Sequence, residues 1–213
     1  MTKIILSLET KESLDIIPYL GKYIDGVKIN HLLWNELDFD VEEGKELFVD
    51  FKLWDTPNTV KTVVESIIKK GGTMTTISTF NNENVFNELE QYKNDIKLLA
   101  VTYLTSWNRD EQYQICREMP DFMWRRHLSR VKGFYGVVCS AQDIGMLSGA
   151  DKSLKRVCPG ITYGNNNSGQ VRTTTPKEAQ DLGADYIVIG RAITESENPL
   201  ETLKQIRNSP ITQ

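Results

Sequence analysis

Short stretches typical of β-strands alternate with amphipathic stretches typical of helices along the whole chain, and this alternation constrains the fold more than any other feature. Eight runs rich in β-branched and other apolar residues are predicted to be strands, at residues 3–8, 26–29, 47–52, 74–78, 97–103, 133–139, 156–158 and 185–189. Strands that alternate with helices pair in parallel and are joined by right-handed crossovers. The chain is therefore predicted to be an α/β protein with a parallel sheet.

Several of the intervening helices carry clear boundary signals. One apolar stripe at helical spacing consists of Val60, Val63, Val64, Ile67 and Ile68, and two glycines at 71 and 72 end that helix. The segment 175–178, Thr-Pro-Lys-Glu, has the pattern of a capping box with proline at the first helical position. Further helices are predicted at 82–92, 111–119, 122–130, 141–147 and 200–206.

Two architectures fit eight such units, a closed (β/α)8 barrel and an open doubly wound sheet. An open sheet that binds a dinucleotide would have a glycine-rich turn after its first strand. Here residues 9–12 are Glu-Thr-Lys-Glu, without any glycine. We therefore expect residues 1–213 to form a single-domain TIM barrel, with its active site at the C-terminal ends of the strands. The segment 164–169, Gly-Asn-Asn-Asn-Ser-Gly, is predicted to be a loop at that rim.

Composition excludes several classes of function. The 25 Lys and Arg residues against 29 Asp and Glu give a net charge of -4, which argues against a nucleic-acid partner. No apolar run reaches the ~18 residues of a membrane span, and the short apolar stretch at the N-terminus is interrupted at Glu9, so no membrane contact and a cytoplasmic location are expected.

The chain is poor in the residues of metal and triad chemistry. Three cysteines form no CxxC pair, so we expect buried or half-buried reduced thiols. The two histidines, His31 and His127, are interpreted as surface or packing residues, which argues against a histidine-rich zinc site or a Ser-His-Asp triad. The chemistry is therefore expected to use Lys, Asp and Glu.

Charged residues interrupt two of the predicted strands. With a period of two, Asp50 and Lys52 share one face of their strand, while Val49, Phe51 and Leu53 share the other. In a barrel the apolar set packs against the outer helices, so Asp50 and Lys52 point inward, and Lys28 alternates in the same way on the second strand. Desolvating charges costs several kcal/mol each unless they are paired. Either these groups form an internal ion pair, or they serve a ligand in a shared pocket.

The sequence around these charges resembles a known family. Residues 50–59, Asp-Phe-Lys-Leu-Trp-Asp-Thr-Pro-Asn-Thr, resemble the D-x-K-x-x-D-I-P-N-T signature of the orotidine 5′-phosphate decarboxylase family. Further segments resemble that family in the same order along the chain, at 25–28, 100–106, 136–142, 159–161, 170–172 and 186–194. The resemblance covers nearly the whole chain.

The resemblance implies decarboxylation of orotidine 5′-monophosphate to uridine 5′-monophosphate and CO₂ in pyrimidine synthesis, without metal or cofactor. It implies that Lys52 donates a proton to C6 of the pyrimidine, within a charged array of Lys28, Asp50, Lys52 and Asp55. It further implies a homodimer in which Asp55 completes the partner subunit's site. The substrate contacts implied by the family motifs are Glu9, Lys28, Asp50, Thr59, Thr105, Gln170, Gly190 and Arg191.

Three positions depart from the family pattern: Glu9 replaces an aspartate that contacts the ribose, Thr162 replaces an arginine found in many bacterial relatives, and Thr56 replaces an isoleucine. Two alternatives stay open. One is a Mg²⁺-dependent sugar-phosphate decarboxylase or synthase of the same superfamily, which shares D-x-K-x-x-D. The other is a non-catalytic nucleotide-binding relative.

Overall fold

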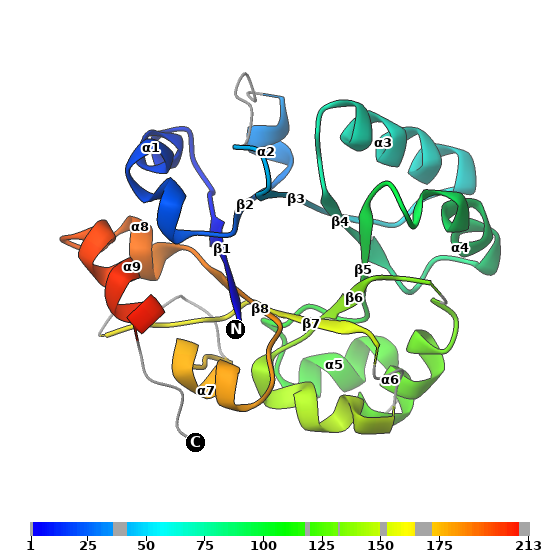
Figure 1. Ribbon diagram of the computed structural model, residues 1–213. Helices are drawn as coiled ribbons and strands as arrows, with labels where there is room; N and C mark the ends of the chain where they lie inside the picture. The colour runs from blue at the N-terminus through cyan, green and yellow to red at the C-terminus, as the bar shows by residue number, and fades with distance from the viewer. Residues whose placement is uncertain are drawn as a thin grey trace.

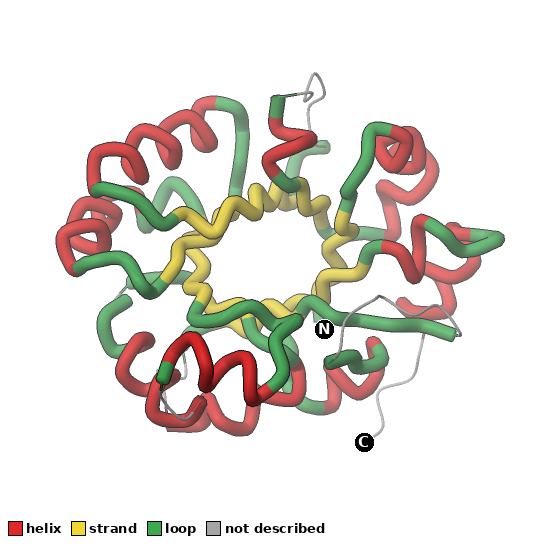
Figure 2. The backbone as a smooth tube through the Cα atoms, turned by 180° about the vertical axis from the view of Figure 1, so that it is seen from behind, coloured by secondary structure: helices red, strands yellow, loops and turns green. Residues whose placement is uncertain are grey.

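A closed ring of eight parallel strands forms the centre of the molecule, as the computed structural model shows (Figure 1). The structure describes residues 2–35, 42–117, 120–131, 133–149, 153–164 and 172–208. The strands are β1 (Lys3–Ser7), β2 (Gly26–Ile29), β3 (Glu46–Leu53), β4 (Met74–Ser78), β5 (Lys97–Val101), β6 (Gly136–Val138), β7 (Lys155–Cys158) and β8 (Tyr186–Ile189). Each strand pairs with the next, and β8 pairs with β1, which closes the ring (Figure 2). The predicted barrel is confirmed.

Helices surround this ring on its outer side (Figure 1). The α-helices are α1 (Ile17–Leu20), α2 (His31–Trp34), α3 (Pro57–Lys69), α4 (Glu83–Leu89), α5 (Arg109–Cys116), α6 (Pro120–Leu128), α7 (Pro176–Asp181), α8 (Arg191–Thr194) and α9 (Pro199–Asn208). Short 3₁₀ helices cover Glu12–Ile16, Gly21–Tyr23, Glu90–Tyr92 and Ala141–Gly149. The capping box predicted at Thr175 and Glu178 is present at the start of α7.

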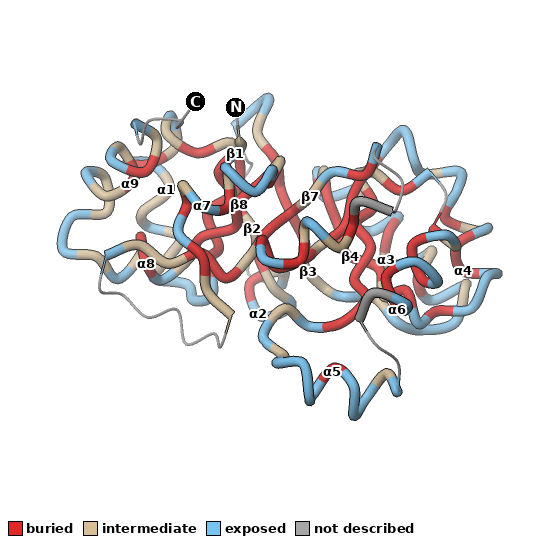
Figure 3. Tube along the Cα trace, turned by 90° about the horizontal axis from the view of Figure 1, so that it is seen from below, coloured by how far each residue is buried: buried red, intermediate tan, exposed pale blue. Residues whose placement is uncertain are grey.

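The two-residue period of the strands separates two apolar layers. One layer fills the inside of the barrel and contains Ile5, Phe48, Met74, Leu99, Val157, Tyr186 and Val188. The other faces the helices, and on β3 it contains Leu47 and Val49, with Phe51 and Leu53 packed against it. Buried residues accordingly follow the strands, whereas exposed residues cover the outer helices (Figure 3). The inward and outward faces predicted for β3 are confirmed.

The first residues of several strands close the N-terminal mouth of the barrel. Glu46 is buried there, forms an ion pair with Lys97 and accepts a hydrogen bond of 2.8 Å from the hydroxyl of Thr73. The hydroxyls of Tyr135 and Tyr186 form a hydrogen bond of 2.7 Å across the same end. Polar contacts and ring packing thus occupy this mouth, whereas Lys28, Asp50 and Lys52 line a cavity at the opposite end.

Some boundaries differ from the predicted ones. The sixth strand begins at Gly136 rather than at residue 133, because Gly133 has a φ of 79°, which extended backbone does not adopt. The helices between β1 and β3 were not predicted, because α1 and α2 have four residues each and are too short for a periodic apolar pattern. Residues 141–149 form a 3₁₀ helix instead of an α-helix.

The cysteines and histidines lie where the sequence predicts them. Cys139 and Cys158 are buried free thiols whose sulfurs are 3.9 Å apart, and Cys116 is a half-buried free thiol. His31 is exposed, whereas His127 is buried and packs edge-on against Phe80. Within the described ranges, no helix is both long and apolar enough to cross a membrane.

Candidate active site

A cavity of about 300 Å³ opens at the C-terminal mouth of the barrel. Its polar and rim lining comes from the ends of the strands and the loops that follow them: Ser7, Glu9, Lys28, Asp50, Lys52, Tyr103, Leu104, Thr105, Ser106, Pro159, Gly160, Ile161, Gly190 and Arg191. Inward apolar side chains, among them Phe48 and Val188, form its floor. The cavity therefore occupies the place where barrels of this type carry their active sites.

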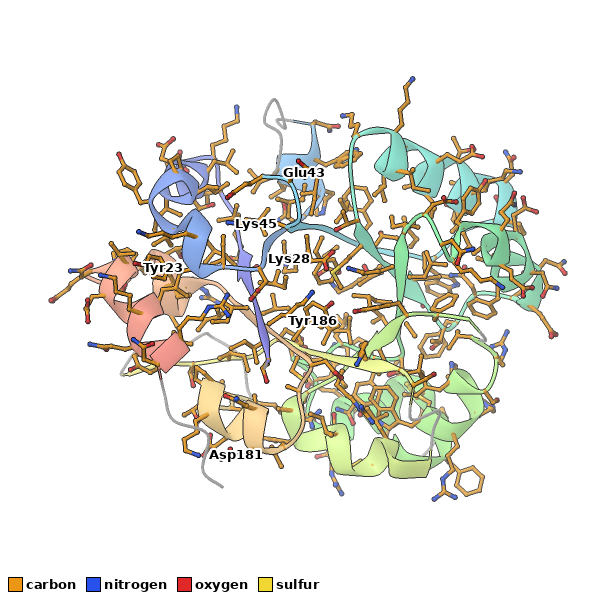
Figure 4. The ribbon with its side chains drawn as sticks, viewed as in Figure 1. Tyr23, Lys28, Glu43, Lys45, Asp181 and Tyr186 are labelled. Carbon is orange, nitrogen blue, oxygen red and sulfur yellow. The ribbon has the colours of Figure 1, made fainter. Side chains whose placement is uncertain are left out.

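A lysine–aspartate–lysine array lies at one side of the cavity. The Nζ of Lys52 is 2.8 Å from Oδ2 of Asp50, and the Nζ of Lys28 is 3.5 Å from the same oxygen. Lys28 comes from β2 and points toward the inside of the ring, as Figure 4 shows. The Asp50 and Lys28 side chains are mostly buried, while that of Lys52 is 42% exposed. The Lys52 ammonium group is thus the one most accessible to a ligand.

Asp50 stays ionised in this setting. Burial by itself would raise the pKa of its carboxyl group, because desolvation disfavours the charged form. The positive charges of Lys28 and Lys52 outweigh burial, and hydrogen bonds from Lys52 and Thr76 add to their effect, so that the pKa of Asp50 lies below its usual value. The array therefore carries two ammonium groups and one carboxylate, a net charge of +1 before any ligand binds.

Gly190 lies at the rim between β8 and α8, and Arg191 is the first residue of α8. Gly190 packs against β1 so closely that a Cβ at this position would lie 3.2 Å from both the Cβ and the carbonyl oxygen of Ser7. A larger residue would therefore require the neighbouring atoms of Ser7 to move by a few tenths of an ångström. The Arg191 side chain lies in the cavity lining and is exposed to solvent.

The structure brings most of the predicted site residues into the cavity, but not all of them. Glu9, Lys28, Asp50, Lys52, Thr105, Gly190 and Arg191 line it. Gln170 lies outside the described residues. Asp55 and Thr59 are absent from the lining: Asp55 lies in the loop before α3, and Thr59 lies in the first turn of α3.

Asp55 is fully exposed and bound locally. Its carboxylate accepts a hydrogen bond of 2.6 Å from the backbone N–H of Thr56. This bond, together with one from the Thr59 side chain, lowers the pKa of Asp55, so the group stays ionised. Its own backbone N–H donates to Oδ1 of Asn81 at 3.2 Å. Asp55 is therefore held in a fixed position outside the cavity of its own chain.

Two sets of buried polar residues near the cavity were not singled out from the sequence. Thr76 on β4 contacts both Asp50 and the backbone of Lys52. Adjacent threonines in one strand must face opposite sides, so Thr75-Thr76 already indicates that one hydroxyl points into the barrel. That alternation is the signal that could have found Thr76.

The second set links the cavity lining to the surrounding helices. The hydroxyl of Tyr103, which lines the cavity, donates to Asp143 at 3.1 Å and accepts from the indole N–H of Trp124 at 2.9 Å. The other oxygen of Asp143 forms an ion pair with Arg172. Burial and the charge of Asp143 raise the pKa of Tyr103, so its hydroxyl remains a donor. No local sequence signal marks this network, because its members come from separate βα units.

The fold and the cavity define a class of protein: a (β/α)8-barrel enzyme whose site works with lysine and carboxylate side chains. The chain belongs to the orotidine 5′-phosphate decarboxylase / HUMPS family, whose model matches residues 2–206. The resemblance found in the sequence is thereby confirmed.

Individual relatives agree with this assignment. The orotidine 5′-phosphate decarboxylase of Dictyoglomus turgidum is 33% identical, over 94% of this chain and 90% of the relative. That of Wolbachia pipientis is 34% identical, over 98% of this chain and 99% of the relative. The crystal structure of orotidine 5′-phosphate decarboxylase from Lactobacillus acidophilus superimposes with a TM-score of 0.75 at 27% identity, covering 97% of this chain and 98% of that one.

Proposed function

We propose that this chain decarboxylates orotidine 5′-monophosphate to uridine 5′-monophosphate and CO₂, as a step of pyrimidine biosynthesis. The observation that carries this proposal is the Lys28–Asp50–Lys52 array inside the cavity, in a chain whose relatives bear that enzyme's name.

The array suits a reaction that leaves an electron pair on carbon. In the proposed step the bond between C6 and the carboxylate breaks, CO₂ departs, and the electron pair stays on C6. The Lys52 ammonium group stabilises this charge and then donates a proton to C6, after which the neutral amine regains a proton from water. Asp50 repels the substrate carboxylate, and loss of CO₂ relieves that repulsion.

The remaining site residues bind the parts of the substrate that do not react. Arg191 and the Gly190 backbone hold the phosphate at the rim, together with Gln170. Glu9 and Lys28 contact the ribose, and Thr105 contacts the pyrimidine edge. The binding energy of the remote phosphate can thus stabilise a strained arrangement at C6. Support comes from the cavity lining, in which Arg191 and Lys52 come from different βα units.

The metal-dependent alternative requires free carboxylate oxygens in the cavity. Asp50 offers little capacity for a cation, because its Oδ2 binds two ammonium groups and its Oδ1 accepts from Thr76. A divalent ion at Asp50 would have to displace both lysines, which leaves Glu9 as the other carboxylate among the described lining residues. The occupied Asp50 carboxylate, and the name shared by the relatives, favour the orotidylate reaction over the Mg²⁺-dependent one.

A spectrophotometric assay that follows the loss of orotidine 5′-monophosphate, with and without EDTA, tests the proposal. Turnover that EDTA does not affect supports it. Metal-dependent turnover of a sugar phosphate would instead establish the first alternative, and nucleotide binding without turnover the second.

We further propose that the active form is a homodimer in which Asp55, with Thr59 beside it, completes the partner's site. Asp55 is ionised, exposed and outside its own cavity. The neighbouring Trp54 is 71% exposed, and its ring lies 6.3 Å from that of the partly exposed Phe80. Exposed aromatic pairs of this kind are typical of protein interfaces.

Mixing two inactive variants tests this arrangement. In a mixed dimer of Lys52→Ala and Asp55→Ala chains, one site collects both defects and the other collects none. Equal, fully exchanged mixtures should therefore reach about a quarter of the wild-type activity by statistical pairing. If subunits exchange and no activity returns, Asp55 does not act across an interface.

A further inference from the structure

Thr76 connects two members of the charged array, Asp50 and Lys52. It is fully buried on β4, and its hydroxyl donates a hydrogen bond of 2.8 Å to Oδ1 of Asp50. The Thr76 hydroxyl oxygen in turn accepts a hydrogen bond of 2.8 Å from the backbone N–H of Lys52. The Thr76 hydroxyl therefore contacts both the Asp50 carboxylate and the backbone of Lys52, the lysine that pairs with that carboxylate.

The backbone at Lys52 needs such a partner. Lys52 has a φ of 50°, and the register between β3 and β4 shifts between Val49 and Leu53. A residue other than glycine in this region is strained, and strain of this kind persists only where the surroundings hold it. The Lys52 N–H has left the regular ladder and is satisfied by the Thr76 side chain instead.

Asp50 is surrounded by groups with distinct roles. Lys28 from β2 and Lys52 from β3 both bind Oδ2, whereas Thr76 from β4 binds Oδ1. Glu9 and Arg191 line the same cavity from the ends of β1 and β8. The two lysines fix one oxygen, and the contact with Thr76 fixes the rotation of the carboxylate about its own axis.

We propose that Thr76 is a positioning residue that sets the geometry of the Lys52–Asp50 pair through both of its hydrogen bonds. The expected effect on kcat rests on the proposed function, whereas the expected effect on the Asp50 carboxyl group does not. Thr76 does not line the cavity, so it acts through Lys52 and Asp50 rather than on the substrate.

Thr76→Val removes the hydroxyl and keeps the shape of the side chain. Thr75→Val is a matched control, because Thr75 is also fully buried on β4 and its hydroxyl donates to the backbone oxygen of Val49 at 2.9 Å. Both variants lose a buried hydroxyl, but only Thr76 contacts the array. Thr76→Ser keeps the hydroxyl and should restore function.

We expect kcat of Thr76→Val to fall by roughly tenfold to a hundredfold, the effect of losing a hydrogen bond to a charged group, with KM changed little. Thr75→Val should keep kcat within about twofold, and Thr76→Ser should return most of the loss. The inference is overturned if Thr76→Val keeps wild-type kcat, or if Thr75→Val loses as much. If Thr76→Val does not fold, Thr76→Ala provides the same kinetic test.

NMR titration of the aspartate carboxyl carbons, with Asp50→Asn for assignment, separates this inference from the proposed function. Thr76→Val should raise the pKa of Asp50 relative to both wild type and Thr75→Val, whether or not the protein turns over orotidine 5′-monophosphate. An unchanged Asp50 titration would refute the positioning role. A wild-type protein without turnover would refute the proposed function alone.

Discussion

Replacing Asp143 with asparagine should destabilise the protein far more than the loss of an ordinary ion pair. Asp143 is 2% exposed, and it binds Arg172 through one oxygen and the Tyr103 hydroxyl through the other. The Arg172 side chain is itself only 14% exposed, so water cannot replace the lost charge. The new amide would keep one acceptor oxygen, but it would leave a buried guanidinium group without its counter-charge.

The expected magnitude follows from this burial. Removing one partner of a buried pair costs about 3 kcal/mol or more, because the remaining charge stays desolvated. For a chain of this size, each kcal/mol lowers Tm by roughly 2–4 °C, so a loss of roughly 6–12 °C is expected. Thermal and urea unfolding followed by circular dichroism would measure both quantities.

A matched control is available on the surface. Lys177 and Asp181 form an ion pair of 2.6 Å on α7, with both side chains 40% exposed. Asp181→Asn should cost less than about 0.5 kcal/mol, since exposed pairs at this spacing contribute little. Replacing both buried partners, Asp143→Ala with Arg172→Met, should recover part of the stability lost in Asp143→Asn. If Asp143→Asn melts within roughly 2 °C of Asp181→Asn, the shift that 1 kcal/mol or less produces, the reasoning about burial is refuted.

Three further predictions concern the cavity. Lys52→Ala should lower kcat by at least about a thousandfold while the protein stays folded, because acid catalysis and charge stabilisation both disappear. The control Lys61→Ala, which breaks an outer ion pair with Glu88, should leave kcat unchanged. Near-wild-type turnover by Lys52→Ala would remove Lys52 from the proton-donor role. Arg191→Ala should raise KM for orotidine 5′-monophosphate by about two orders of magnitude, the effect of a lost charge-assisted phosphate contact, and a fall in kcat alone would reassign Arg191. The pKa of Asp50 is lower in the folded than in the unfolded protein, so the ionised Asp50 contributes its full share to the stability of the fold above the unfolded pKa of about 3.9. This contribution is lost as pH falls through the lower folded pKa. The difference in unfolding free energy between wild type and Asp50→Asn should therefore shrink below about pH 4, and a constant difference would contradict this.

Local sequence patterns were enough for much of the architecture. The eight strands follow from runs of β-branched residues, and closure into a barrel follows from repeated alternation without a glycine-rich first turn. The inward direction of Asp50 and Lys52 follows from the period of two, because neighbouring apolar residues must face the helices. The same period brought Lys28 to the array.

Only the tertiary structure decided how these groups meet. The contacts of Thr76 with Lys52 and Asp50, and the network of Tyr103, Asp143 and Arg172, join residues more than twenty positions apart. They depend on the register of β3 against β4 and on which loops meet at the mouth. A strand's own sequence fixes which face each side chain takes, because that is a property of the local backbone. Register and loop packing depend on contacts between distant segments, and a left-handed backbone at a lysine has no local signal at all.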